Sequence, residues 1–168
     1  NVAKGSGTDI RLTPADLGDV TDNCLQEGGT CSVDLAHGWK LQLEDPGEKS
    51  LASPLTIAGN VFFTTYIPST EADGASPCLP AEGAGRLYAV DLKTAASVVN
   101  YDVSDDDPNY VGEPTTKNDR STELVAPGIP AQVVLVPPNK ILRPDLQVDD
   151  LSFTTRWRSF WYIQEDAL

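Results

Sequence analysis

Hydrophobic side chains in this chain recur mainly at the two-residue period of β-strands. The run 38–43, Gly-Trp-Lys-Leu-Gln-Leu, alternates apolar and polar residues. One short helix is predicted over 13–17, because Thr13 is a residue type that caps helix N-termini and Pro14 suits the first helical position. The pattern predicts an all-β fold with little helix and about four strands per repeating unit. Further strand-like runs, bounded by turn-forming residues, occupy 55–58, 61–67, 86–92, 97–103, 130–136 and 153–163.

The run 61–67 carries bulky side chains on both of its faces. Because side chains alternate along a strand, one side holds Val61, Phe63, Thr65 and Ile67, and the other holds Phe62, Thr64 and Tyr66. A sheet stacked between two neighbouring sheets gives a strand this environment. The pair Gly59-Asn60, between 55–58 and this run, predicts the turn of a β-hairpin. A second turn is predicted at 45–48, Asp-Pro-Gly-Glu.

Two polar stretches are predicted to be long loops. The stretch 68–85 is rich in Ser, Gly, Pro and acidic residues, and the stretch 104–122 is polar and contains Pro108 and Pro114. Substitutions within 104–122 are therefore expected to leave stability nearly unchanged. The Gly-Ser-Gly at 5–7 has neither the lysine nor the preceding strand of a phosphate-binding loop, and a flexible lead-in is expected there.

Composition and charge narrow the class of partner. The chain has 168 residues of which 40% are hydrophobic, which favours a domain with a core over disorder. A net charge of −13 would be repelled by nucleic acid and by an anionic bilayer, so neither is an expected partner. The longest apolar runs, such as 133–136, are too short to cross a membrane. The chain contains no methionine and begins at Asn1, so we expect a fragment or processed product of a longer protein.

The three cysteines, Cys24, Cys31 and Cys78, point to an oxidising compartment. Two glycines between Cys24 and Cys31 let the chain turn back, so a local disulfide is expected, which would stabilise the fold by about 2–3 kcal/mol. The alternatives are that these thiols are unpaired or that each pairs elsewhere. The spacing does not match the paired knuckles of zinc sites. A disulfide favours the periplasm or the exterior, and leaves Cys78 to pair outside this sequence.

Several short segments follow the order found in the C-terminal region of PilY-type proteins. They span roughly 17–165 and read ADLGDVTDN, GWKLQL, GEKSLASPLTIAGNVFFTTYIP, GRLYAVDLKT, GIPAQVVLV and RWRSFWYIQE. The piece LYAVDLKT occurs across quinoprotein-like propellers, whereas the combination with a terminal strand of aromatic residues and arginines is more specific. The chain therefore resembles the C-terminal propeller region of the PilY family of type IV pilus tip adhesins.

This resemblance implies the C-terminal blades of a quinoprotein-like β-propeller, with four-stranded antiparallel blades. Residues 1–37 would form a loop-rich lead-in and residues 38–168 the terminal blades. The implied function is non-enzymatic: pilus assembly, surface adhesion and twitching motility, in a periplasmic to extracellular location at the pilus tip or cell surface. The expected partners are the remainder of its own propeller or N-terminal part, minor pilins or the pilus tip, and a host or abiotic surface.

No catalytic or cofactor-binding residue is predicted. The single histidine, His37, sits beside a turn glycine, and no nucleophile motif accompanies it, so a surface position is expected. Quinoprotein dehydrogenases stack their cofactor on a tryptophan. Trp39, Trp157 and Trp161 nevertheless fall at strand positions, where packing between sheets is the ordinary use of a large ring.

No metal site is predicted either. Members of the resembling family carry a calcium loop, and Asp105, Asp107 and Asn109 match the first, third and fifth ligand positions of such a loop. Tyr110 and Thr116 stand where the loop needs its turn glycine and its closing acid. Solvated carboxylates are therefore expected at this position.

Two other functions are compatible with the sequence. One is a fragment of a periplasmic quinoprotein-type dehydrogenase, which the lack of a recognisable calcium–quinone site and of a credible base disfavours. The other is a structural subunit of an extracellular filament, in which the long loops would contact neighbouring copies.

Overall fold

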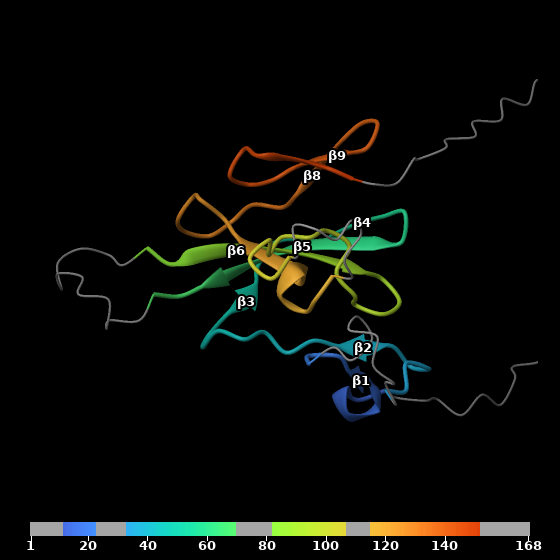
Figure 1. Ribbon diagram of the computed structural model, residues 1–168. Helices are drawn as coiled ribbons and strands as arrows, with labels where there is room; N and C mark the ends of the chain where they lie inside the picture. The colour runs from blue at the N-terminus through green and yellow to red at the C-terminus, as the bar shows by residue number, and fades with distance from the viewer. Residues whose placement is uncertain (1–11, 23–32, 70–81, 107–114, 152–168) are drawn as a thin grey trace, which may run out of the picture.

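The computed structural model describes residues 12–22, 33–69, 82–106 and 115–151 (Figure 1). These residues form mostly strands, turns and irregular segments, so the predicted all-β class is confirmed. Within them no helix is long and apolar enough to cross a bilayer. The elements are η1 (Pro14–Asp16), β1 (Gly18–Asp19), β2 (Trp39–Lys40), β3 (Lys49–Ser50), β4 (Leu55–Ile57), β5 (Asn60–Ile67), β6 (Ala84–Asp91), η3 (Asn118–Arg120), β7 (Ser121–Glu123), β8 (Val134–Val136), β9 (Lys140–Leu142) and β10 (Val148–Asp150).

The central sheet is built around the hairpin of β5 and β6, which pair antiparallel over eight residues each. The short strand β7 pairs with the other edge of β6. Both β3 and β4 pair with β5, β3 opposite residues 65–66 and β4 opposite residues 60–62. The sheet is therefore an antiparallel meander of four positions, in which β3 and β4 share the first position.

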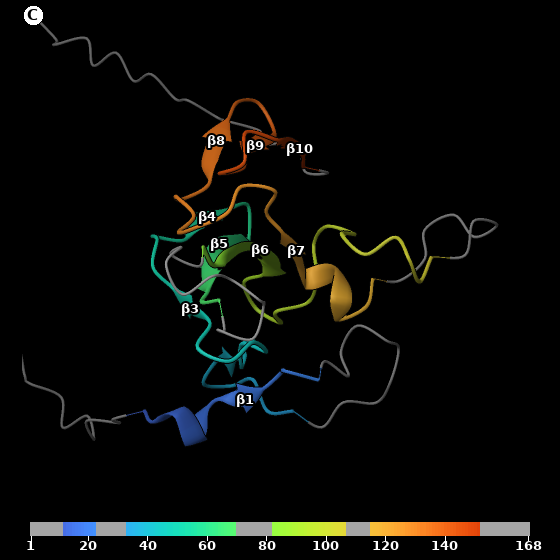
Figure 2. The same cartoon turned by 90° about the vertical axis from the view of Figure 1, so that its left-hand side faces the viewer.

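A second antiparallel meander, β8–β9–β10, lies against one face of the central sheet, as both Figure 1 and Figure 2 show. One hydrophobic core joins the two sheets. Burying a large apolar side chain stabilises a fold by about 1.5–3 kcal/mol, so this shared core holds the layers together. Its buried members are Phe62, Leu87, Ala89 and Leu124 on the central side, and Val133, Ile141 and Leu151 on the other.

The opposite face of the central sheet packs against the small parallel sheet of β1 and β2 (Figure 1). Val20 and Val90 are buried there, and Phe63 packs against them. The ring of Phe63 also stacks on that of Tyr88, with centroids 4.8 Å apart and planes within 2° of parallel. The prediction that the strand at 61–67 is covered on both faces is confirmed.

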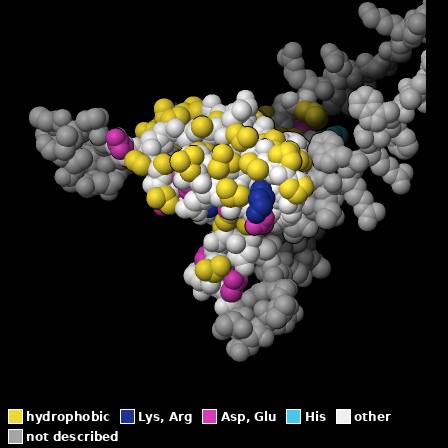
Figure 3. All heavy atoms as spheres, turned by 90° about the horizontal axis from the view of Figure 1, so that it is seen from above, with side chains coloured by type: hydrophobic (Ala, Val, Ile, Leu, Met, Phe, Trp, Pro, Cys, Tyr) yellow, Lys and Arg dark blue, Asp and Glu magenta, His cyan; other side chains and the backbone are white. Residues whose placement is uncertain are grey.

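The outward face of β8–β9–β10 keeps apolar side chains at the surface, and we call it the outer face. Cross-strand register places Val134, Leu142 and Val148 in one row, followed by a row of Val136, Lys140 and Asp150. Val134 and Val148 are 47% and 49% exposed. Lys140 and Asp150 form an ion pair of 2.6 Å. Figure 3, which looks down on this side, shows hydrophobic side chains spread over the described surface.

A polar cluster fixes the inner side of the second sheet. The buried Arg143 contacts Asp145 Oδ2 at 3.0 Å and Asp149 Oδ1 at 3.6 Å. The hydroxyl of Tyr101 donates to Asp149 Oδ2 at 2.9 Å, and the Arg143 guanidinium lies 6.0 Å from the centroid of that tyrosine ring. Burial, reinforced by Asp149, raises the pKa of Tyr101. The cluster therefore ties β9 and β10 to the segment 98–101.

The hairpin between β4 and β5 is confirmed, but its turn is displaced by one residue from the prediction. The turn residues are Ala58 and Gly59, and Asn60 already begins β5. Their φ angles of 51° and 86° lie in the left-handed region, which a two-residue turn of this kind requires at both positions. Glycine adopts this region freely, whereas the Cβ of Ala58 makes it unfavourable.

Other predicted elements are present, several of them shortened. The strand at 86–92 corresponds to β6, and a backbone hydrogen bond closes the turn at 45–48. The strand at 38–43 is reduced to β2, and that at 130–136 to β8. The helix at 13–17 is a single 3₁₀ turn.

Two predictions are wrong in the described residues. The segment 97–103 is not a strand, because its pairing with β6 is a single bridge between Ser97 and Val90. The Ser97 hydroxyl also donates to the carbonyl of Asp119 at 2.8 Å. The predicted surface loop at 104–122 contains η3 and the start of β7. Asp119 and Arg120 there are only 1% and 3% exposed, so substitutions at these two positions are no longer expected to be neutral.

Several predicted features lie outside the described residues and stay predictions. These include the disulfide, the last strand and the rest of the calcium-like loop. The division into residues 1–37 and 38–168 also stays a prediction. The undescribed positions named above are Asn1, Cys24, Cys31, Cys78, Asp107, Pro108, Asn109, Tyr110, Pro114, Trp157 and Trp161.

The strained turn gives a test of the hairpin. Asparagine tolerates the left-handed region better than alanine does, so Ala58→Asn is expected to raise the free energy of unfolding by about 0.5–1 kcal/mol. The matched variant Ala58→Val should lower it, because a β-branched residue tolerates this conformation least. Urea denaturation of both variants is the measurement. Equal stability of all three proteins would show that residue 58 does not hold this turn.

Candidate functional site

A polar cavity of about 200 Å³ lies where the central sheet, the segment after β2 and η3 meet. Its floor belongs to the face of the central sheet that also carries Phe63. One wall is the extended segment 41–44, and the other is the segment 117–120. The lining side chains are Leu41, Gln42 and Glu44 on the first wall, Lys117, Asn118 and Arg120 on the second, and Arg86, Tyr88, Ser121 and Glu123 on the floor.

Cross-strand register explains the floor of the cavity. Arg86 of β6 lies opposite Glu123 of β7, and Tyr88 lies opposite Ser121. Residues directly opposite each other in antiparallel strands point to the same face, with Cβ atoms about 4.5–5.5 Å apart. The alternation along two strands therefore brings four polar side chains onto one small area.

A buried carboxylate, Glu48, ties the turn before β3 to this floor. Its side chain is 0% exposed. Its Oε1 accepts hydrogen bonds from the hydroxyls of Thr65 at 2.6 Å and Tyr88 at 3.1 Å, and its Oε2 accepts one from the N–H of Asp45 at 3.2 Å. Arg86 balances the charge, with Nη2 at 2.8 Å from Asp45 Oδ2 and Nη1 at 3.8 Å from Glu48 Oε2. A buried acid held this way is both paired and hydrogen-bonded.

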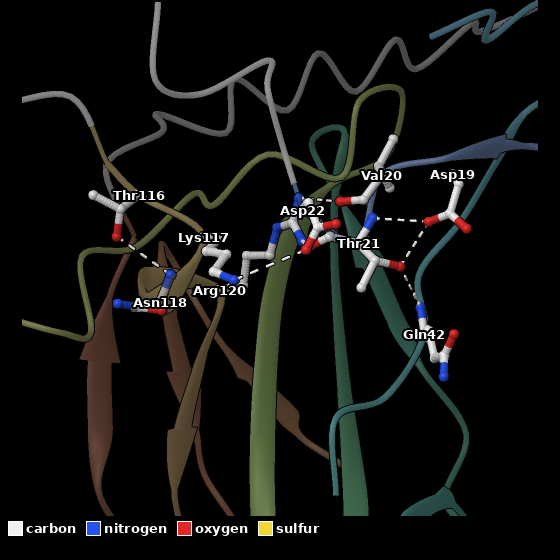
Figure 4. A network of polar contacts seen from close by, with 9 residues as sticks. All are labelled: Asp19, Val20, Thr21, Asp22, Gln42, Thr116, Lys117, Asn118 and Arg120. Atoms are coloured by element: carbon white, nitrogen blue, oxygen red, sulfur yellow. Dashed lines mark hydrogen bonds and ion pairs between the residues drawn. The ribbon is translucent and has the colours of Figure 1, made fainter. Parts of the chain in front are cut away.

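The second wall carries Arg120, which is 3% exposed. Its Nη2 donates to the carbonyl of Val20 at 2.6 Å and its Nη1 to the carbonyl of Thr21 at 3.0 Å (Figure 4). Its Nε is buried and has no hydrogen-bond partner among the described residues. Burial lowers the pKa of Arg120, and the negative charge of Glu44 is the main opposing influence. This arginine therefore clamps the segment after β1 through backbone carbonyls.

Asp119 holds η3 in position. Its carboxylate, 1% exposed, accepts the backbone N–H groups of Asp102 at 2.9 Å and Thr116 at 2.6 Å. Asp119 is buried, whereas Lys117, two residues earlier, lines the cavity. The Nζ of Lys117 lies 4.0 Å from Asp22 Oδ1 (Figure 4). The Asp22 side chain is 99% exposed, so this ion pair is weak.

The lining suits the binding of a polar ligand. It offers guanidinium, ammonium, amide and hydroxyl donors together with two carboxylates, and it contains no histidine or cysteine. What the arrangement supplies is a small concave surface with both signs of charge.

Two residues singled out in the sequence are placed away from this cavity. His37 is exposed, in the turn before β2, as expected of a surface loop histidine. Trp39 is half-buried and packs against the Val20–Val90 cluster, and its Nε1–H donates to the carbonyl of Leu92 at 2.9 Å. The expectation that this ring serves packing is confirmed.

The described part of the calcium-like loop makes internal hydrogen bonds. The Thr116 hydroxyl donates to Asp105 Oδ2 at 3.1 Å, and the Asn100 amide donates to both carboxylate oxygens of Asp106 at 2.9 and 3.0 Å. Among the described residues, no group of three metal-ligating side chains comes together.

Sequence reasoning missed the residues that shape the cavity. The sequence pattern places Asp119 and Arg120 in a polar surface loop and Glu48 in a turn. The sequence of β6 contained a usable signal, because Arg86 and Tyr88 are two residues apart and therefore lie on the same face of the strand. Apolar side chains cover the rest of that face. Charged or hydroxyl-bearing residues on a covered face indicate a polar site beneath or beside the sheet.

The chain is 37% identical over 68 residues to a protein of Xylella fastidiosa (strain Temecula1) named type IV pilus biogenesis factor PilY1 homolog. The alignment covers 38% of this chain and 4% of that relative, so the chain spans only a small part of the relative's length. No family model and no solved structure matches the chain. The similarity indicates a relation to PilY-type pilus biogenesis proteins over the aligned segment.

The buried carboxylate gives a second test. Glu48→Ala is expected to lower the free energy of unfolding by about 3–5 kcal/mol, because it leaves Arg86 half-paired and removes the acceptor of two hydroxyls. The matched variant Glu123→Ala, at an exposed position of the same floor, should change it by less than about 0.5 kcal/mol. Chemical denaturation of both variants is the measurement, and equal losses would contradict the assigned role of Glu48.

The floor tyrosine gives a test at alkaline pH. Burial raises the pKa of Tyr88 from 10.0 to about 12, with Arg86 opposing this shift and Glu48 reinforcing it. The folded protein therefore keeps this proton after the unfolded chain has lost it. Stability is fully present below pH 10.0 and is lost as the pH rises towards about 12. Denaturation curves across this range should show the decline, with a shallower slope in Tyr88→Phe. A pH-independent stability there would contradict the burial of this hydroxyl.

Proposed function

We propose that this chain is part of a type IV pilus biogenesis and surface-adhesion protein, acting as a non-enzymatic binding module. The observation that carries the proposal is the 37% identity over 68 residues with the pilus biogenesis factor of Xylella fastidiosa. The ordered segments from GWKLQL to GIPAQVVLV support the same relation. The proposed location is periplasmic to extracellular, at the pilus tip or cell surface, because a pilus-associated protein acts there.

In finer detail, the two stacked meanders are proposed to be consecutive blades of a β-propeller. Blades of this fold are four-stranded antiparallel sheets that pack face to face around an axis. The central meander fills four positions, and the next meander follows it along the chain and shares its core. The strand predicted at 153–163 is the proposed fourth position of the second blade.

The outer face of β8–β9–β10 is the proposed contact with the remainder of the same propeller. The apolar row of Val134, Leu142 and Val148 would be stabilised by a covering layer, as the apolar side chains on both faces of the central sheet are. Minor pilins or the pilus tip, and a host or abiotic surface, are the further proposed partners. Loops on a rigid β-scaffold would make those contacts.

The proposal is tested in the bacterium that encodes the full-length protein. Deleting the gene is expected to remove surface pili and twitching motility, and the unaltered gene should restore both. A gene carrying Val134→Lys and Val148→Lys should fail to restore them, because two ammonium groups cannot be buried without partners. The control Val103→Lys changes a residue that is 72% exposed and should restore both.

Electron microscopy of surface pili and twitching zones on agar are the readouts. Normal pili and motility after complete deletion would contradict the pilus function. Full restoration by the double lysine variant would leave the pilus function standing and contradict the assigned contact of the outer face.

A further inference from the structure

Three arginines of the described residues are largely buried, and one of them differs from the others in its partners. Arg86 and Arg143 each contact two carboxylates, at distances between 2.8 and 3.8 Å. Arg120 is 3% exposed, yet among the described residues no carboxylate oxygen lies within 4.0 Å of its guanidinium. The wall of the cavity therefore holds a buried cation without a direct counter-charge.

Burying a cation without a counter-charge is costly, and the surroundings of Arg120 offset the cost only in part. The carbonyls of Val20 and Thr21 satisfy two of its donors but carry no full negative charge. Lys117, in the same turn of chain, adds a second cation whose ion pair spans 4.0 Å to a fully solvated acid. One wall of the cavity thus has an excess of positive charge.

The same cavity is also lined by Glu44 and Glu123, which are exposed. Among the described residues neither carboxylate lies within 4.0 Å of a lysine or arginine nitrogen. A purely anionic ligand would meet repulsion from these two acids, and a purely cationic ligand would meet it from Arg120 and Lys117. A ligand that carries one charge of each sign meets attraction from both sets.

The size of the cavity limits the ligand further. Pockets for drug-sized molecules have volumes of about 300–1,000 Å³, and this cavity has about 200 Å³. Its occupant therefore has few heavy atoms. The amides of Gln42 and Asn118 and the hydroxyl of Ser121 add neutral donors and acceptors to the lining.

We propose that this cavity binds a small zwitterion of the size of a free amino acid. The ligand's carboxylate lies against Arg120 and Lys117, and its ammonium group lies against Glu44 and Glu123. The site goes beyond the proposed pilus function and does not depend on it. Binding supplies Arg120 with the charged partner that Arg86 and Arg143 find within the chain.

The experiment is isothermal titration calorimetry on the full-length protein with lysine, glutamate and glycine as zwitterionic probes. Acetate and methylammonium, at matched ionic strength, are the single-charge probes. At least one amino acid should bind saturably and at least tenfold more tightly than either single-charge probe. Lys117→Gln and Glu123→Gln should each weaken this binding at least tenfold, while the control Lys93→Gln, in the turn after β6, should bind as the unaltered protein does.

Both lining positions are exposed, so the variants are expected to fold, and their thermal unfolding curves serve as the check. Three results would overturn the proposal: no saturable binding of any amino acid, equally tight binding of acetate alone, or unchanged binding in either Lys117→Gln or Glu123→Gln. Amino-acid binding that is weakened in both variants and kept in the Lys93→Gln control supports the site.

Discussion

The long antiparallel pairing of β5 with β6 is the interaction on which the rest of the structure depends. It sets Phe62, Leu87 and Ala89 towards one layer, and Phe63, Tyr88 and Val90 towards the other. Because side chains alternate, a slip of one residue in this register would exchange the two faces. Burial on both sides fixes the register, and the two flanking sheets are held by the surfaces that result.

Charged groups specify how the layers and connections fit around this sheet. Glu48 and Arg86 fasten the turn before β3, and Arg143 with its two aspartates fastens the second meander. Arg120 fastens the segment after β1 through carbonyls alone. Paired buried charges hold one geometry, whereas an incompletely paired one beside a cavity can accept an external partner. Arg120 thus holds the segment after β1 in place and also contributes positive charge to the cavity.

The sequence predicted the parts of the fold that depend on local pattern. Bulky side chains on both faces of the run 61–67 predicted a strand that is covered on both sides. The pair Gly59-Asn60 predicted the hairpin, whose turn lies one residue earlier. The hairpin of β9 and β10 was missed because its strands are only three residues long. Asp119 and Arg120 were missed for a different reason. Asp119 binds the N–H of Asp102, seventeen residues away, and Arg120 binds the carbonyl of Val20, one hundred residues away, and no local pattern records such contacts.

Thiol accessibility of the intact protein tests most directly whether another layer covers the outer face. A full-length protein carrying Val148→Cys would be treated with a maleimide, and labelling at this position would be followed by peptide mass spectrometry. If another layer covers the outer face, the thiol of Val148→Cys is protected from the maleimide until the protein is unfolded. The control Val103→Cys, at a position that is 72% exposed, is labelled in the native state. Rapid labelling at both positions in the native, full-length protein would contradict the account.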